Sequence, residues 1–268
     1  MPPLKVAVVG KGGVGKTFVS GTLAKSFRES GQMVVAIDAD PAMNLYFELG
    51  IDQKTVKAVT PLSENKQLIQ DRTGTNLDDA YPVFNLNPFV DDIVEKYAIE
   101  SPDGVKLLIA GTVRSSGEGC MCPANALLRA LLRHAFVRLP ATVIMDMEAG
   151  LEHFGRGTIQ YVDAVVNVLE PSIQSLETSV QIERLARELG IKKHLFVANK
   201  ISNENEKRFI VKALASHQQR LEVTIPYDEN VRMRGIIQEK FSLRKDSPAV
   251  IAIKELQNRL YAIQHFAS

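Results

Sequence analysis

The chain has 268 residues, 45% of them hydrophobic, and carries 32 Lys and Arg side chains against 31 Asp and Glu. A chain of this size can bury a substantial core, and its net charge of +1 gives no general attraction to nucleic acid or to an anionic membrane. No apolar run approaches the ~18 residues of a membrane span, and the short run at 6–9 is too brief for a secretory signal. We therefore expect a cytoplasmic protein with no membrane span and no nucleic-acid partner.

Short β-branched apolar runs alternate along the chain with longer segments of helical periodicity, a pattern typical of a parallel α/β sheet. Strands are predicted at 5–10, 33–40, 105–111, 142–148, 164–171, 194–200 and 221–227. Helices, with apolar residues at i, i+3 and i+4, are predicted at 16–29, 124–139, 174–189 and 204–219. The expected fold class is α/β, a mostly parallel twisted sheet of about seven or eight strands with helices on both faces.

Residues 51–104 depart from this alternation, and we expect them to form an insertion or a side layer on the first half of the sheet. No linker, repeat or low-complexity tract divides the chain, so residues 1–268 are expected to form a single domain. Near the end of the chain, one helical face is apolar and the opposite face is mixed rather than basic, which favours packing against the body over membrane binding. The apolar face consists of Ile253, Leu256, Leu260 and Ile263.

The segment GKGGVGKT, residues 10–17, joins the first predicted strand to the first predicted helix. It fits the phosphate-loop pattern G-x-x-x-x-G-K-[ST], but Gly10, Gly12 and Gly15 also fit the dinucleotide fingerprint G-x-G-x-x-G. Asp38 lies near the distance at which dinucleotide-binding folds hold a ribose. A dinucleotide oxidoreductase is therefore an alternative on this segment alone.

Lys16 and Thr17 favour a nucleoside triphosphate over a dinucleotide. A pyrophosphate on a dinucleotide turn is held by backbone N–H groups and the helix dipole, and needs neither side chain. A triphosphate needs a lysine ammonium at the β- and γ-phosphates and a hydroxyl on magnesium. The predicted nucleotide-binding residues of this segment are Gly12, Gly13, Val14, Gly15, Lys16, Thr17 and Phe18.

The second lysine of the loop, Lys11, makes KGGVGKT resemble the deviant phosphate loop of the MinD/ArsA/nitrogenase-iron-protein class of ATPases. The resemblance implies a phosphate-loop NTPase fold and a homodimer in which Lys11 reaches the partner's nucleotide while Lys16 acts within its own chain. Phe18 departs from the class, which usually has a hydroxyl residue there near the α-phosphate. The missing hydroxyl is expected to weaken one contact with the α-phosphate, while the backbone N–H of Phe18 stays available.

Two further motifs end predicted strands beside the loop: DADP at 38–41 and VIMDMEAG at 143–150. The same resemblance implies that Asp40 orients the attacking water and that Asp146 holds the magnesium shell. It also implies that Asn199 and Pro226, which follow later strands, contact the adenine of ATP. The N-K pair at Asn199 also occurs in GTP-binding proteins, so GTP stays an alternative.

The chain has only two cysteines, Cys120 and Cys122, with Met121 between them. In a regular strand their Cα atoms would lie ~6.5–7 Å apart, whereas the sulfurs of one tetrahedral site need to be closer. Flanking glycines and Pro123 indicate an irregular turn, and the start of the next helix favours the thiolate form. The alternative is that both are small apolar core residues.

Two thiolates are half of a closed soft-metal site, which takes four ligands. His134 is a poor third ligand because ten helical residues place it ~15 Å away. A two-fold axis through the turn would instead bring together the Cys120 and Cys122 pairs of two chains. A shared metal site and the lysine that acts across the interface then follow from the same homodimer.

The segments GCMCPANALLRALLRH, DMEAGLEHFGRGT and PLSENKQLIQDRTG, together with the deviant loop, resemble the CooC family, ATPases that mature nickel enzymes and above all carbon monoxide dehydrogenase. The resemblance runs the length of the chain. It implies an ATP-dependent metallochaperone that uses ATP and Mg²⁺, carries Ni²⁺ at Cys120 and Cys122, and has carbon monoxide dehydrogenase or a related nickel enzyme as its client. Thiolates suit Zn²⁺ equally well, so nickel comes from the resemblance alone.

Other functions remain possible on the sequence. The client could be acetyl-CoA synthase in place of carbon monoxide dehydrogenase. A MinD/ParA-type switch ATPase acting on membrane or DNA shares the phosphate loop, although the neutral charge and the mixed C-terminal helix count against it.

Overall fold

The computed structural model describes residues 2–76, 83–111, 123–148, 161–191, 193–236 and 246–265. An eight-stranded sheet in the order β3-β4-β2-β5-β1-β6-β7-β8 crosses the molecule, and only the β3–β4 pair is antiparallel. The strands are β1 (Lys5–Val9), β2 (Val34–Ala39), β3 (Ile99–Glu100), β4 (Lys106–Ile109), β5 (Thr142–Met147), β6 (Ala164–Leu169), β7 (His194–Ile201) and β8 (Leu221–Pro226). The predicted α/β fold is confirmed, and the two-residue edge strand β3 is the one described strand that its pattern did not predict.

The helices of the described ranges include the four predicted from their periodicity, the C-terminal helix with the predicted apolar face, and several short ones. They are α1 (Lys16–Glu29), α2 (Leu45–Glu48), α3 (Gln53–Lys57), α4 (Lys66–Thr73), α5 (Ile93–Tyr97), α6 (Pro123–Val137), α8 (Ile173–Glu188), α9 (Glu204–Ser216), α10 (Glu229–Ile236) and α11 (Pro248–His265). Two of the long helices begin at side-chain caps: Ser172 accepts from the Ser175 N–H and Asn203 from the Glu206 N–H. Helix α10 was not predicted, because its sequence has no clear apolar period.

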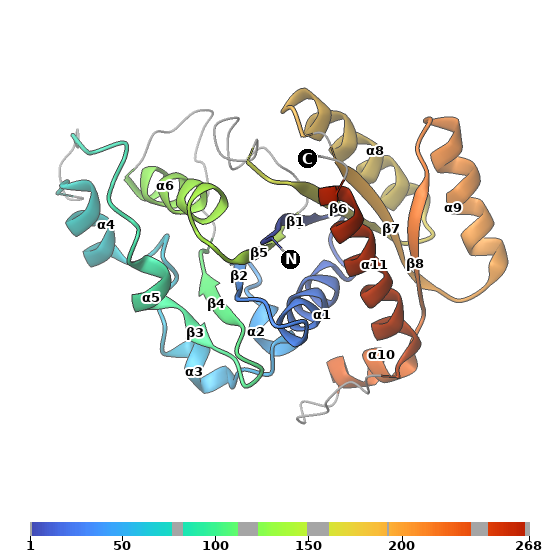
Figure 1. Cartoon of the computed structure of the whole chain (residues 1–268), viewed down its shortest axis with the longest axis horizontal. Coiled ribbons are helices and arrows are strands. Elements are labelled where there is room, and N and C mark those ends of the chain that lie inside the picture. The colour runs from blue at the N-terminus through green and yellow to red at the C-terminus, as the bar shows by residue number, and fades with distance from the viewer. Residues whose placement is uncertain are drawn as a thin grey trace.

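Alternate residues of the central strands face two different helical layers. In β1, Val6 and Val8 pack with α1 and α11, whereas Ala7 and Val9 pack with α6 and α8. Figure 1 shows α1 and α11 on one side of the sheet and α6 and α8 on the other. Both faces of the sheet are therefore covered, which explains why its strands read as continuous apolar runs.

The described parts of the segment from 51 to 104 lie beside β4. The Leu62 N–H donates to the Ile109 carbonyl at 3.0 Å, which ties the segment to the end of β4. Leu68 and Ile93, from α4 and α5, belong to the same apolar cluster as α6. The prediction that the whole chain forms one domain stays a prediction.

Helix α11 packs on α1, in agreement with the predicted role of its apolar face. Ile253, Leu256 and Leu260 are fully buried, and the Tyr261 ring meets the Phe27 ring edge-on at 5.3 Å. Within the described ranges, none of the helices is both long and apolar enough to cross a bilayer.

Candidate nucleotide-binding site

The phosphate loop leaves β1 at the middle of the sheet and enters α1 at Lys16. Two of its glycines are required by the backbone and by close neighbours. Gly10 has φ +145°, and a Cβ there would lie 2.1 Å from the Val168 carbonyl oxygen. Gly15 has φ +94°, and a Cβ there would lie 2.3 Å from Asn199 Nδ2. The loop therefore delivers the N-terminus of α1, with its free N–H groups, to the edge of the sheet where anions bind.

The lysine that ends the loop, Lys16, lies back across it. Lys16 is 5% exposed, and its Nζ donates to the Lys11 carbonyl oxygen at 3.3 Å. This contact keeps the Lys16 ammonium against the phosphate loop, where a bound phosphate chain would lie. The half-buried Lys11 lies on this loop, and its action on a partner's nucleotide stays a prediction.

Asp146 lies near the end of β5, beside the first turns of α1. Its side chain is fully buried, the Ser20 hydroxyl donates to Oδ1 at 3.0 Å, and Oδ2 has no hydrogen-bond partner among the described residues. Burial raises the pKa of Asp146 to about 6, although the neighbouring Thr17 and Ser20 hydroxyls lower it. A buried carboxylate oxygen without a partner, next to a threonine hydroxyl, is a donor set that Mg²⁺ takes directly or through water.

Asp38 lies next to Asp146 in register across β2 and β5. Burial raises its pKa to about 7, and both carboxylate oxygens accept backbone N–H groups: Oδ1 from Asp40 at 3.2 Å and Oδ2 from Leu45 at 2.9 Å. The carboxylate therefore holds the loop after β2, and it does not extend outward as a ribose ligand would. This role was not predicted from the sequence, because only the contact with Leu45 reveals it.

Asp40 is half-buried at the beginning of the loop that Asp38 holds. Its Oδ1 accepts the Ala42 N–H at 2.8 Å, which orders the loop around it. The side chain stands at the same sheet edge as the phosphate loop, because β2 and β1 both flank β5 in parallel. The prediction that it orients water is compatible with this position.

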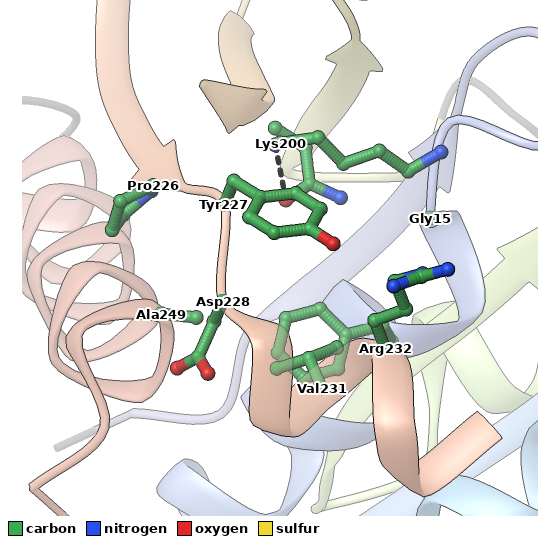
Figure 2. Close-up of a pocket in the computed structure, with 10 residues that line it drawn as sticks. Gly15, Lys200, Pro226, Tyr227, Asp228, Val231, Arg232 and Ala249 are labelled. Atoms are coloured by element: carbon green, nitrogen blue, oxygen red, sulfur yellow. Dashed lines mark hydrogen bonds between the residues drawn. The ribbon is translucent and has the colours of Figure 1, made fainter. Parts of the chain in front are cut away.

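A cavity of about 300 Å³ opens beside Gly15 at the edge of β7 and β8. It is lined by Gly15, Phe18, Asn199, Lys200, Pro226, Tyr227, Asp228, Val231, Arg232 and Ala249. Figure 2 shows Lys200 and Arg232 extending toward Gly15, with the Tyr227 ring between β8 and the loop. The two residues predicted to contact adenine, Asn199 and Pro226, lie in this cavity together with Phe18. The residues from α10 and α11 were missed, because those helices reach the cavity only through the fold.

Asn199 and Lys200 of β7 donate to carbonyl oxygens of the phosphate loop. Asn199 Nδ2 donates to the Val14 carbonyl oxygen at 2.8 Å, and its Oδ1 accepts the Lys200 N–H at 2.9 Å. Lys200, with φ +61°, places its Nζ 2.6 Å from the Gly13 carbonyl oxygen and 3.1 Å from Glu170 Oε2. The Asn199 amide is thus engaged with the loop, and its contact with the base stays a prediction.

Cys120 and Cys122 lie outside the described residues, immediately before α6 begins at Pro123. His134 Nδ1 lies 2.9 Å from Asp91 Oδ1, so this nitrogen faces the side layer, and the expectation that His134 is a poor third ligand stays a prediction. Over the part of the chain that the structure describes, no cluster of three or more His, Cys, Asp or Glu side chains could hold a metal ion.

Comparison with known proteins agrees with this geometry. Residues 5–236 match the CobQ/CobB/MinD/ParA nucleotide binding domain. The chain is 44% identical over 229 residues to the carbon monoxide dehydrogenase accessory protein CooC of Rhodospirillum rubrum, which covers 85% of this chain and 86% of that protein. It is 38% identical over 264 residues to an uncharacterized ATP-binding protein of Methanocaldococcus jannaschii, covering 98% of this chain and 99% of the other.

Among solved structures, MinD in the MinC:MinD cell division complex of Aquifex aeolicus superposes with a TM-score of 0.68 at 18% identity, over 96% of this chain and 95% of that one. This likeness establishes the fold. The chain therefore belongs to the CobQ/CobB/MinD/ParA family of nucleotide-binding ATPases, and within it is a homologue of CooC.

Proposed function

We propose that this ATPase is a metallochaperone that delivers nickel to carbon monoxide dehydrogenase during maturation of that enzyme, cycling through a homodimer that depends on nucleotide and metal. One observation carries the proposal: the 44% identity to CooC, named as a carbon monoxide dehydrogenase accessory protein, over most of both chains. The family membership already makes the chain an ATPase, so the proposal concerns the cargo, the client and the residue roles.

The phosphate loop would bind the triphosphate through its backbone N–H groups, with the Lys16 ammonium at the β- and γ-phosphates. Thr17 and Asp146 would hold Mg²⁺, the first by its hydroxyl and the second by its buried, unpartnered oxygen. When bound, the ion neutralises charge that develops on the phosphoryl oxygens. The cavity beside Gly15 would take the base, between Asn199 and Pro226.

Asp40 would orient the attacking water. Asp38 would hold Asp40 in position, because its Oδ1 accepts the Asp40 backbone N–H. Lys11 of each chain would reach the nucleotide of its partner, so hydrolysis needs the dimer. The base cavity and the phosphate loop lie within one chain, whereas this lysine contact would be completed only by pairing.

The cargo would be held by Cys120 and Cys122 of two chains, four thiolates in all. The N-terminus of α6, which begins at Pro123, would favour the thiolate form. Coupling between the metal and ATP is reciprocal by linkage, so metal should favour the dimer and nucleotide should change the affinity for metal.

The test is activation of nickel-free carbon monoxide dehydrogenase by the nickel-loaded protein, with and without Mg-ATP. We expect faster activation than free nickel gives, only with Mg-ATP, and loss of this advantage in the Cys120→Ser/Cys122→Ser double variant. The double variant should still bind ATP, because the described nucleotide site contains neither cysteine. Equal activation by the double variant would refute the shared thiolate site, and equal activation by free nickel would refute delivery. A MinD-type switch has weaker support, since a septum site-determining protein MinD of Synechocystis is 27% identical over 69% of this chain, whereas CooC is 44% identical over 85% of it.

A further inference from the structure

Arg234, near the end of α10, is an almost fully buried arginine with an unusually complete set of contacts. It is 9% exposed, its Nη1 donates to Glu48 Oε2 at 2.6 Å, and its Nη2 donates to the Phe47 carbonyl oxygen at 2.8 Å. The guanidinium also lies over the Phe47 ring, 4.9 Å from its centroid. One side chain thus joins α10 to α2, two helices whose residues are 186 positions apart.

At one end of this link is the cavity proposed for the base. Val231 and Arg232 of α10 line the cavity, and Tyr227 and Asp228 line it just before the helix begins. Figure 2 shows Val231 and Arg232 on the helix that forms this wall. Arg234 lies three positions after Val231 and two after Arg232 on the same helix. A shift of α10 toward a bound base would therefore also move Arg234.

At the other end is the loop that carries Asp40. Helix α2 begins at Leu45, whose N–H donates to Asp38 Oδ2 at 2.9 Å, while Asp38 Oδ1 accepts the Asp40 N–H. Glu48 ends α2 and lies against α1, where a Cβ at Gly21 would be only 2.3 Å from the Glu48 Cβ. Helix α2 is therefore confined by α1, and Arg234 holds its last residues to α10.

The pair is poorly explained by stability alone. Burial raises the pKa of Glu48 even though Arg234 lowers it, so the low-polarity surroundings oppose the charge that the pair needs. Buried ion pairs often contribute no more than apolar side chains of the same volume. What a guanidinium with its two terminal nitrogens on separate acceptors adds is a defined geometry between the two helices.

We infer that Arg234 is a positioning residue that couples occupancy of the base cavity to the placement of the Asp40 loop. A base that seats the α10 wall fixes Arg234, which fixes α2 and, through Leu45 and Asp38, the loop of Asp40. The inference rests on the proposed roles of the cavity and of Asp40. It predicts that a triphosphate with a base is hydrolysed faster than the same triphosphate without one.

The test compares ATP with ribose 5′-triphosphate as substrates, measuring kcat and KM separately. Coupling in the usual range for linked sites makes wild-type kcat about tenfold higher for ATP. Arg234→Gln should lower kcat for ATP about tenfold, to the value for ribose triphosphate, and leave kcat for ribose triphosphate unchanged. Arg234→Lys, which keeps the charge but not the planar pair of donors, should lie between the two, about threefold down for ATP alone.

The matched control is Arg208→Gln, which removes an exposed arginine of α9 paired with Glu204 and should change neither substrate. A purely structural role would lower both substrates equally in Arg234→Gln, and that result would overturn the inference, as would equal kcat for both substrates in wild type. If Arg234→Gln does not fold, Arg234→Lys decides by the same comparison. The assay contains no client enzyme, so failure of delivery leaves this inference standing, and an equal loss on both substrates leaves delivery standing.

Discussion

Replacing Gly15 by alanine tests whether the loop geometry depends on the late strand β7. Gly15 has φ +94°, a conformation that costs an alanine about 1–2 kcal/mol. The new Cβ would also lie 2.3 Å from Asn199 Nδ2, forcing this amide away from the Val14 carbonyl oxygen. Leaving that oxygen without its partner costs about 1–3 kcal/mol, so we expect a loss of about 2–5 kcal/mol in the free energy of unfolding.

The chain offers a control at Gly31, which has φ +83° and no neighbouring atom within 4 Å of the position that a Cβ would take. Gly31→Ala should lose only the backbone part, about 1–2 kcal/mol. Urea unfolding of both variants gives the difference, and the KM for ATP should rise in Gly15→Ala only. A Gly15→Ala variant no less stable than Gly31→Ala would refute the reasoning. In an Asn199→Ala background, where the crowded amide is absent, Gly15→Ala should cost no more than Gly31→Ala.

Two further predictions concern ionisable groups. Burial lowers the pKa of Lys5 from 10.5 to about 8, although Asp163 raises it. As the pH rises, the folded state therefore loses this proton before the unfolded state does. The free energy of unfolding should rise by up to about 3 kcal/mol between pH 8 and 10.5. In Lys5→Met this part of the rise should vanish, as measured by urea unfolding at both pH values; an unchanged slope would contradict it. If Lys11 acts across the dimer, mixing equal amounts of the inactive variants Lys11→Ala and Asp40→Ala should restore about a quarter of wild-type ATP hydrolysis, because half the dimers are mixed and each has one complete site. A mixture as inactive as its components would place Lys11 in its own chain's site.

The alternative of a dinucleotide oxidoreductase is answered by two findings of different kinds. The family match covers residues 5–236 and is to a nucleotide-binding ATPase domain. Independently, both oxygens of Asp38 are used by backbone N–H groups, so the carboxylate that would have held a ribose is committed to the Asp40 loop. The match of the loop glycines to the dinucleotide fingerprint was therefore coincidental. Lys16 and Thr17 correctly indicated a nucleoside triphosphate rather than a dinucleotide.

Much of the fold and the phosphate loop could be predicted because their causes are local. Val6 and Val8 face one layer and Ala7 and Val9 the other, so a strand covered on both sides shows as an unbroken apolar run. The loop needs its glycines and its lysine within eight consecutive residues, because one strand and one helix must present amides and an ammonium to the same phosphates. The predicted cysteine site lies outside the described residues and stays a prediction.

Other features depended on residues that come together only after the chain has folded. Asp38 and Asp40 look alike in DADP, and their roles separate only when Leu45 and Asp40 donate to Asp38. Helix α10 has little apolar period of its own, yet it forms one wall of the base cavity and carries Arg234 to Glu48. Short contiguous patterns specify backbone conformation and the chemistry of one loop, because both are set by neighbours along the chain. The partners of a buried charge are chosen by the packing of distant helices, which no local pattern records.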